Sequence, residues 1–183
     1  MADLNHADAG DLLGLTSLCP PPAEPREPLC DPSRPETPMI PGSHHDLVRA
    51  YGTGCFDEFL WIFAAGADNV NLEIGAATSA TRSILKGKAA PDLREALARH
   101  RAAPEELVQW GATDNGDSLL WIPDGDPADW PTVVVQAGQL DFTISSRSST
   151  GVVLDLMTGE FHPRFFPDDF PSGHPEFSPN PYA

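Results

Sequence analysis

Residues 110–131, WGATDNGDSLLWIPDGDPADWP, indicate a β-hairpin followed by an acidic loop. Trp110 and Gly111 end an apolar segment, and strand-like composition resumes at residues 118–122 after a run of Asp, Asn and Gly. The dipeptide Asn115-Gly116 tolerates positive φ, so it suits a primed two-residue turn, although Asn and Gly also occur in ordinary loops. The stretch pairs no nucleophile with a base. Its composition therefore indicates a structural or binding role and not a catalytic one.

Further strand-like segments lie on both sides of this hairpin and are rich in β-branched and aromatic residues. Residues 55–63 form the densest apolar run, which is typical of a buried strand. The segments alternate irregularly with helical patterns, and no β-α-β period is present. The sequence therefore predicts a single α+β domain with a mixed or antiparallel sheet flanked by helices. The expected strands are residues 55–63, 106–110, 119–122, 132–136 and 141–145.

Helices are predicted from apolar spacing together with residues that favour helix ends. Ser43 can cap a helix that Gly52 ends. Ser148 or Ser149 can open another helix, which Gly159 ends. The expected helices are residues 4–18, 43–51, 69–85, 92–101 and 148–157.

Prolines divide the chain into three parts. Nine of them lie between Pro20 and Pro41, and we expect this stretch to run as an extended, polyproline-like linker over the surface. The alternative is that it is a ligand for an aromatic-lined groove. Phenylalanines lie between the later prolines and predict a tail without regular structure. We expect the phenylalanine rings to hold this tail against the body. The expected division is a short helix plus proline-rich segment at 1–39, the α+β domain at 40–171 and a C-terminal tail at 172–183.

The chain is strongly acidic. Its 183 residues carry a formal net charge of −16 at pH 7, which repels nucleic acid and argues against a direct nucleic-acid binder. From Trp110 onward the Lys and Arg residues are Arg147 and Arg164 alone, so the negative charge is concentrated there. A partner for this charge would be basic. The alternative is that the acidity only maintains solubility.

Cysteine usage and hydropathy indicate a cytoplasmic protein. Cys19, Cys30 and Cys55 are odd in number and lack a CxxC spacing, which argues against a disulfide framework and a structural zinc site. No window reaches the roughly 18 apolar residues that span a bilayer, and the first residues lack a signal-peptide pattern. We expect reduced thiols, no cofactor and no membrane contact, whereas the sequence does not indicate an oligomeric state.

Histidines and carboxylates are the obvious material for an enzyme or a metal centre, and they show no diagnostic spacing. His44 and His45 lie in the first turn of a predicted helix, where exposed histidines are common. Asp124, Asp126 and Asp129 resemble the start of a calcium loop, but the sixth position lacks Gly and the twelfth lacks Glu. The sequence therefore predicts no catalytic residue and, beyond a weak adventitious cation site, no metal site.

Tryptophans and aspartates around the hairpin are the candidate binding residues. Trp110 and Trp121 are expected mainly in the core, whereas Trp130 is the predicted exposed contact. Asp114 and Asp117 have two interpretations, as turn formers that bond local backbone amides and as contact residues. The carboxylates of the acidic loop would form a rim and set the approach of a basic partner. The partner-binding hypothesis comprises Asp114, Asp117, Asp124, Asp126, Asp129 and Trp130.

Three blocks of the sequence resemble the SUKH superfamily, the Smi/Knr-like family that includes fungal cell-wall regulators and bacterial toxin-immunity proteins. The first is Ile40-Pro41 leading to DLVRAYGTGCFDEFLWIF, and the second is LVQWGATDNGDSLLWIPDGDPADWPTVVV. The third is the helix from Ser148 with Met157-Thr158-Gly159 and the Phe-Pro tail. Together these blocks cover most of residues 40–171. The motif residues are Tyr51, Gly52, Gly54, Trp110, Gly111, Asn115, Gly116, Trp121, Pro131 and Gly159.

The resemblance implies an α+β binding domain that is not an enzyme. The expected function is that of an immunity-type protein, which sequesters a cognate toxin that would be basic and could be a nuclease. The alternative is a general regulatory interaction scaffold of the Smi/Knr type with no toxin partner. A small hydrolase is the third candidate.

Overall fold

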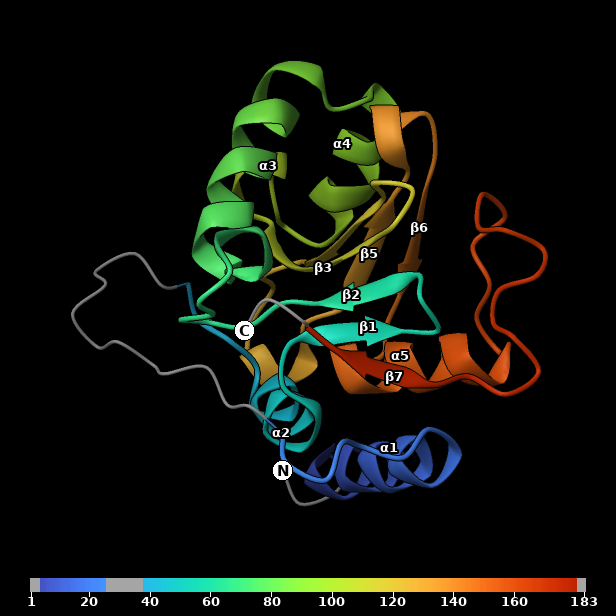
Figure 1. The fold of residues 1–183 in the computed structure, drawn as a ribbon. Helices are drawn as coiled ribbons and strands as arrows, with labels where there is room; N and C mark the ends of the chain where they lie inside the picture. The colour runs from blue at the N-terminus through green and yellow to red at the C-terminus, as the bar shows by residue number, and fades with distance from the viewer. Residues whose placement is uncertain (1–3, 26–37, 181–183) are drawn as a thin grey trace.

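The computed structural model describes residues 4–25 and 38–180 (Figure 1). Its seven strands form one sheet in the order β6-β5-β4-β3-β2-β1-β7, with every neighbouring pair antiparallel. Helices cover both faces, so the predicted α+β domain is confirmed. The strands are β1 (Gly54–Phe56), β2 (Leu60–Ile62), β3 (Val108–Thr113), β4 (Ser118–Trp121), β5 (Thr132–Val135), β6 (Phe142–Ser145) and β7 (Phe177–Pro179). The α-helices are α1 (Leu4–Leu18), α2 (Gly42–Tyr51), α3 (Ile74–Lys88), α4 (Pro91–Arg99) and α5 (Ser149–Thr158).

Most of the expected proline-rich linker, residues 26–37, lies outside the described residues, as do residues 1–3 and 181–183. The described parts of the linker, residues 20–25 and 38–41, contain no helix or strand. The prediction of an extended linker therefore remains a prediction for residues 26–37.

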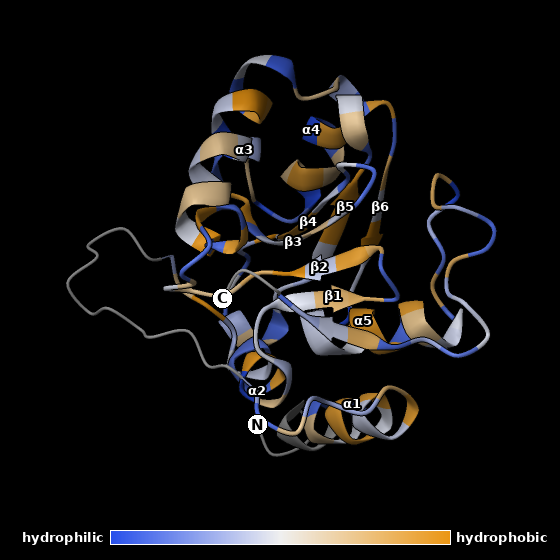
Figure 2. Ribbon diagram, in the orientation of Figure 1, coloured by the Kyte–Doolittle hydropathy of each residue, from blue (hydrophilic) through white to orange (hydrophobic). Residues whose placement is uncertain are grey.

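The sheet has a hydrophobic core on each face, because its central strands are apolar at successive positions. In β4, Leu119 and Trp121 belong to one cluster, whereas Leu120 belongs to the other. Helices α1, α2 and α5 contribute to the first cluster, and α3 and α4 contribute leucines to the second. Figure 2 shows hydrophobic residues along β2, β5 and β6. Burial on both sides explains why β4 and β5 lack the polar alternation of a half-exposed sheet, whereas the edge strand β6 keeps it.

The apolar run at 55–63 is two strands, and the prediction of one buried strand is wrong. Asp57 and Glu58 interrupt the run and adopt positive φ angles of 53° and 56°. The Phe59 N–H donates to the Phe56 carbonyl at 3.0 Å, which closes a tight turn between β1 and β2. Two consecutive residues with positive φ define the primed turn that matches the twist of a hairpin. Strand pairing starts at Phe56 and Leu60, so Phe59 follows the turn as an additional loop residue. The aromatic residues on each side made this turn difficult to recognise in the sequence.

The predicted hairpin at 110–122 is present as β3 and β4, with a different turn. Gly116 has a φ of 86°, whereas Asn115 does not have a positive φ, so the turn is not the primed two-residue type. The Gly116 N–H donates to the Thr113 carbonyl at 2.9 Å, and the Thr113 N–H donates to the Asp117 carbonyl at 3.0 Å. This pattern is typical of a three-residue loop with Gly in the left-handed position. One residue with positive φ suffices here, and glycine occupies it.

Cap residues set several helix ends. At the start of α5, the Ser148 hydroxyl accepts a backbone N–H at 3.2 Å, and Gly159 ends the helix with a φ of 75°. Gly52 ends α2, also with a φ of 75°. Ser43 is not a cap, because α2 begins directly after Pro41 and Ser43 already lies in its first turn. These two helices therefore end as predicted, while the start of α2 differs.

Helices α3 and α4 follow the predicted segments at 69–85 and 92–101, with a later start for α3. A short 3-10 helix, η1 (Val70–Leu72), precedes α3. The buried Glu73 carboxylate then caps α3 by accepting the Ala76 N–H at 2.7 Å. Because a cap residue adopts extended backbone geometry, Glu73 separates the two helices.

The C-terminal tail is fastened to the body by its rings and by a seventh strand. Phe166 and Phe170 are buried, and their ring centroids lie 5.2 and 4.6 Å from that of Phe59. Strand β7 pairs with β1, so the prediction that the tail contains no regular structure is wrong. Gly54 permits this pairing, because a Cβ there would lie 2.4 Å from the Phe177 ring. The open edge of β1 supplies the backbone partners that the tail sequence does not reveal.

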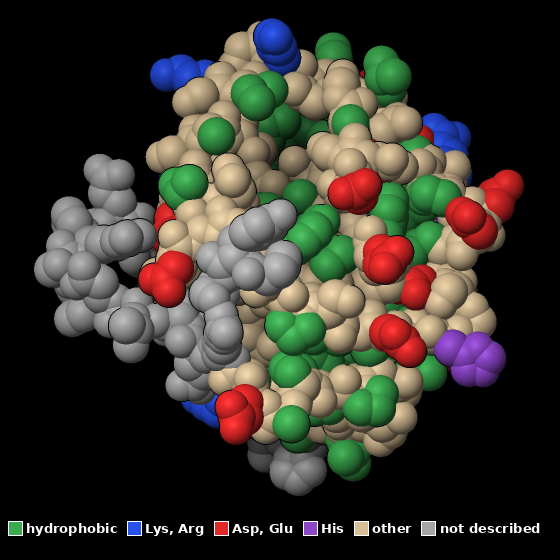
Figure 3. All heavy atoms as spheres, in the orientation of Figure 1, with side chains coloured by type: hydrophobic (Ala, Val, Ile, Leu, Met, Phe, Trp, Pro, Cys, Tyr) green, Lys and Arg blue, Asp and Glu red, His purple; other side chains and the backbone are tan. Residues whose placement is uncertain are grey.

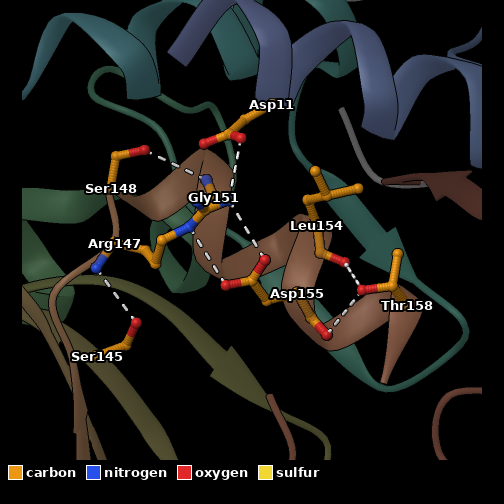
Figure 4. A network of polar contacts seen from close by, with 8 residues as sticks. All are labelled: Asp11, Ser145, Arg147, Ser148, Gly151, Leu154, Asp155 and Thr158. Carbon is orange, nitrogen blue, oxygen red and sulfur yellow. Dashed lines mark hydrogen bonds and ion pairs between the residues drawn. The ribbon is translucent and has the colours of Figure 1, made fainter. Parts of the chain in front are cut away.

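Helix α1 joins the body through apolar packing and an ion-pair network (Figure 4). Leu15 is fully buried in the core that α5 shares. The Arg147 guanidinium bonds to Asp11 of α1 at 3.0 Å and to Asp155 of α5 at 3.3 Å. The packed body therefore includes α1 and β7, which both lie outside the range expected for the domain.

We predict that Leu15→Ala lowers the free energy of unfolding by about 2–5 kcal/mol, because it leaves a cavity between α1 and the body. Leu13 on the same helix is 69% exposed, so Leu13→Ala serves as the matched control and should change stability by about 0.5 kcal/mol or less. Urea denaturation of both variants measures the difference. Equal stabilities would show that α1 is not part of the cooperative fold.

Candidate functional site

The aspartates expected to bind a partner lie at opposite ends of the strands. Because neighbouring strands are antiparallel, the β3–β4 turn with Asp114 and Asp117 lies at the same end of the sheet as the β1–β2 turn. The acidic loop, which we define as the β4–β5 connection at residues 122–131, lies at the other end. The predicted partner-binding residues therefore separate into two regions.

The acidic loop is closed by backbone hydrogen bonds at its base. The Ile122 N–H donates to the Pro131 carbonyl at 2.9 Å. Asp126 caps the 3-10 helix η3 (Pro127–Asp129) by accepting a backbone N–H at 3.0 Å. This local order fixes the positions from which the carboxylates project.

The loop carries an excess of negative charge. Asp124 is half-buried and forms an ion pair with Arg101 at 2.5 Å. Asp126 and Asp129 are exposed, and within residues 4–25 and 38–180 neither forms an ion pair with a cation. Asp126 and Asp129 thus remain as exposed carboxylates, whereas Asp124, the third expected rim charge, is neutralised by Arg101.

A cavity of about 480 Å³ lies between the acidic loop and strand β6. Its walls include Asp126 and Asp129 from the loop, His100 next to α4, and Ile144 and Ser146 from the end of β6. The cavity is open to solvent and is lined by carboxylates, by Arg101, which pairs with Asp124, and by the apolar side chain of Ile144. This arrangement can accept a long cationic side chain, because the carboxylates bind its head and Ile144 contacts its methylene groups.

The prediction that Trp130 is an exposed contact is wrong. Its side chain is buried, with 7% of the residue exposed, and it packs in the core cluster of α5. The indole N–H donates to the Gly125 carbonyl at 3.3 Å. Gly125 has a φ of 78°, which turns the loop back over the ring. Trp130 therefore anchors the acidic loop to the body instead of contacting a partner.

Asp117 is also buried, so its assignment as a contact residue is wrong. Its carboxylate accepts the Thr113 hydroxyl at 2.7 Å and the Ala137 N–H at 2.8 Å. The alternative interpretation as a turn former is therefore the correct one, because the carboxylate links two neighbouring turns. Asp114 is exposed, and its N–H donates to the Phe59 carbonyl at 2.8 Å. It lies beside the β1–β2 turn, away from the acidic loop.

A second acidic surface, the tail groove, lies at that end of the sheet. It is a cavity of about 480 Å³ between the β1–β2 turn and the tail, with carboxylates at Asp57, Glu58, Asp169 and Glu176. Figure 3 shows acidic side chains gathered over the β1–β2 turn and the tail, on the right of the view. The Asp57 carboxylate accepts the Ser172 hydroxyl at 2.7 Å, which holds the tail against the turn. The sequence alone does not predict this groove, although the acidic pair Asp57-Glu58 within an apolar run is a signal for an exposed turn.

His44 is buried, with 1% of the residue exposed, which corrects the expectation of an exposed histidine. Its Nε2 lies 2.8 Å from the Phe63 carbonyl, and its Nδ1 lies 3.1 Å from the Ser149 hydroxyl. A carbonyl only accepts, so Nε2 donates to Phe63 and Nδ1 accepts from Ser149. Burial lowers the pKa of His44 from 6.5 to about 4, so the ring is neutral at pH 7. Its i, i+3 and i+7 spacing with Leu47 and Tyr51 was the sequence signal that it faces the core.

Trp110 and Trp121 are fully buried, as expected, and enclose the His44 ring. The His44 centroid lies 5.8 Å from that of Trp110 and 4.8 Å from that of Trp121, in edge-on geometry. Neither indole N–H has a hydrogen-bond partner in the part of the chain that the structure describes. Both tryptophans therefore stabilise the core by packing alone.

Tyr51 and Gly111, two further motif residues, have packing roles. The buried Tyr51 hydroxyl donates to the Cys19 carbonyl at 2.6 Å and so joins α2 to the end of α1. Gly111 lies at a bulge in β3, where a Cβ would be 2.8 Å from the Trp61 carbonyl. These positions serve the fold rather than a binding surface.

The described thiols are buried and unreactive. Burial raises the pKa of Cys19 to about 11 and that of Cys55 to about 12, and nearby carboxylates act in the same direction. Cys30 lies outside the described residues. Within the described ranges, no group of three His, Cys, Asp or Glu side chains could hold a metal ion. No helix in that part of the chain has the length and apolar character needed to cross a membrane.

Comparison with family models, curated proteins and solved structures finds no match for this chain. The acidic loop and the tail groove are the two candidate interaction surfaces.

We predict that the free energy of unfolding falls as the pH decreases from about 6.5 to about 4, in part because of His44. The unfolded chain binds this proton below pH 6.5, whereas the folded protein binds it only near pH 4. This linkage contributes up to about 3 kcal/mol above pH 6.5, which is lost progressively on acidification. His44→Gln retains an N–H donor for the Phe63 carbonyl but does not titrate, so its stability should depend less on pH.

Urea denaturation between pH 4 and pH 7 measures this difference. His174→Gln is the matched control, because His174 is exposed and lies in the tail, outside α2, so this variant should differ from the wild type less than His44→Gln does. Parallel curves for the wild type and His44→Gln would contradict the neutral buried ring.

Proposed function

We propose that this chain is a non-catalytic protein-binding domain of the immunity type, which sequesters a cognate basic toxin in the cytoplasm. The observation that carries the proposal is the acidic loop, where Asp126 and Asp129 are exposed beside an open cavity. The net charge of −16 also supports a basic partner, since it attracts cationic proteins over a long range. The sequence resemblance to the SUKH superfamily supports this class of function.

The physical basis of the inhibition would be occupation of the toxin. A basic nuclease domain uses its positive surface to bind phosphate, and an acidic protein competes for the same surface. Complementary charge increases the rate of encounter, whereas packing at the centre of the interface sets the lifetime of the complex. The binding protein needs no catalytic residue for this role.

The positions of the histidines favour binding over hydrolysis. The Ser149 hydroxyl and the His44 ring form a nucleophile and base pair, but both residues are buried and neither can reach a substrate. His100 and His174 line the two acidic cavities, and in the described structure neither hydrogen-bonds to a carboxylate. General base catalysis requires such an oriented pair with access to the substrate.

Co-expression with the basic toxin domain encoded by a neighbouring gene tests the proposal. We predict that this chain restores growth and that the two proteins copurify as a stable complex. Restored growth without a complex would instead support the hydrolase alternative. Failure to restore growth or to bind would refute the immunity function and favour the regulatory scaffold of the Smi/Knr type.

We predict that the double variant Asp126→Asn, Asp129→Asn slows association with that toxin domain about tenfold at low ionic strength and flattens the salt dependence of the rate. The substitutions preserve shape, and Asn at position 126 still caps η3. The matched control is Glu58→Gln, Asp169→Asn in the tail groove, which removes the same net charge at the other end of the sheet. Surface plasmon resonance at several salt concentrations measures both. Equal effects would show that net charge, and not the acidic loop, directs binding.

A further inference from the structure

Strand β6 is an open edge of the sheet, because β5 is its only neighbour among residues 4–25 and 38–180. The Gln136 N–H donates to the Asp141 carbonyl at 2.9 Å, which identifies these residues as a hydrogen-bonded pair. Such pairs alternate along an antiparallel ladder, so Thr143 and Ser145 also direct their backbone groups toward β5. The N–H and C=O groups of Phe142 and Ile144 therefore point away from the sheet.

The open backbone groups are concentrated at Ile144. The Asp141 carboxylate accepts the Phe142 N–H at 2.8 Å and so satisfies that donor. Ile144 has no comparable side-chain partner in the described structure. The opposite edge differs, since β7 ends in Pro179, which has no N–H to offer. Proline and lysine are residues that protect edges against added strands, and β6 contains neither.

The cavity beside the acidic loop borders this open edge. Ile144 and Ser146 line the cavity together with Asp126, Asp129 and the Arg101–Asp124 ion pair. The Ile144 side chain packs on the face of the sheet that α3 and α4 cover. A strand added to β6 would direct every second side chain toward that same face. Those side chains would meet the carboxylates at the cavity.

We propose that β6 binds an extended basic segment of a protein partner as an eighth strand, with a Lys or Arg side chain of that segment in the cavity. The inference rests on the proposed function and states how the basic partner is held. Backbone hydrogen bonds at Ile144 supply affinity, and the carboxylates select the charge. A second copy of this chain is disfavoured as the occupant, because it would bring two acidic loops together.

Binding of synthetic peptides tests the proposal. The probe is acetyl-Lys-Thr-Lys-Val-Lys-Thr-amide, and the controls are the same peptide with Glu in place of Lys and a version with N-methylated backbone amides. We expect the Lys peptide to bind at least tenfold more tightly than either control. Binding should also slow hydrogen exchange of the Ile144 amide at least tenfold, as measured by NMR. Equal binding of the N-methylated peptide, or no binding of the Lys peptide, would overturn strand addition.

Variants of the protein provide a second test of strand addition. Ile144→Pro removes the N–H that points away from the sheet, at an edge position that tolerates proline. This variant should bind the Lys peptide at least tenfold more weakly than the wild type. Ile144→Val preserves the backbone and is the matched control, expected to bind like the wild type. Unchanged peptide binding by a folded Ile144→Pro variant would contradict the proposal. Analytical ultracentrifugation provides a further check. A wild-type dimer that is absent in the Ile144→Pro variant would also contradict the proposal, because β6 would then be occupied by a second copy.

The toxin co-expression test separates this inference from the proposed function. If the wild type and a folded Ile144→Pro variant restore growth and bind the toxin domain equally, strand addition is refuted and the immunity function stands. If the wild type restores no growth, the immunity function is refuted, and the peptide measurements alone decide whether β6 accepts a strand.

Discussion

The hydrogen bonds of His44 connect the parts of this protein that must meet for one core to form. The ring belongs to α2, its Nε2 donates to the carbonyl of Phe63 after β2, and its Nδ1 accepts from Ser149 of α5. Trp110 and Trp121 surround the ring and exclude water. A buried polar group is stabilising only when it is paired, so the three segments must reach these positions together. The candidate surfaces are built at the two ends of the sheet that this arrangement holds.

Local residues determined the features that could be predicted from sequence. Ser148 and Gly159 define the ends of α5 through a side-chain acceptor and a positive φ, both of which are properties of single residues. The existence of the β3–β4 hairpin followed from its turn residues in the same way. Features that depend on distant contacts were not predictable. Strand β7 forms because β1 has an open edge, and nothing in the tail sequence alone shows that edge.

Only the part of the candidate site that depends on local residues could be predicted from sequence. Asp126 and Asp129 are exposed because polar loop residues usually stay in water, and composition alone indicates this. Asp117 and Trp130 are buried although both belong to the same sequence block. The Asp117 carboxylate accepts the Ala137 N–H of the next turn, and the Trp130 indole donates to the Gly125 carbonyl of its own loop. Sequence patterns do not encode those partners. The tail groove required knowledge that residues 57–58 and 169–176 meet, which is again a long-range fact.

The pairing of β1 with β7 also has a consequence during synthesis of the chain. A ribosome produces Gly54 to Phe56 long before Phe177, so the backbone groups of β1 have no covering strand while most of the polypeptide is being made. The contact has a large sequence separation, and contacts of that kind form late. Until β7 is added, the edge exposed to other chains is β1, whereas afterwards it is β7, which ends in a proline. Unpaired strand edges in incompletely folded chains favour self-association.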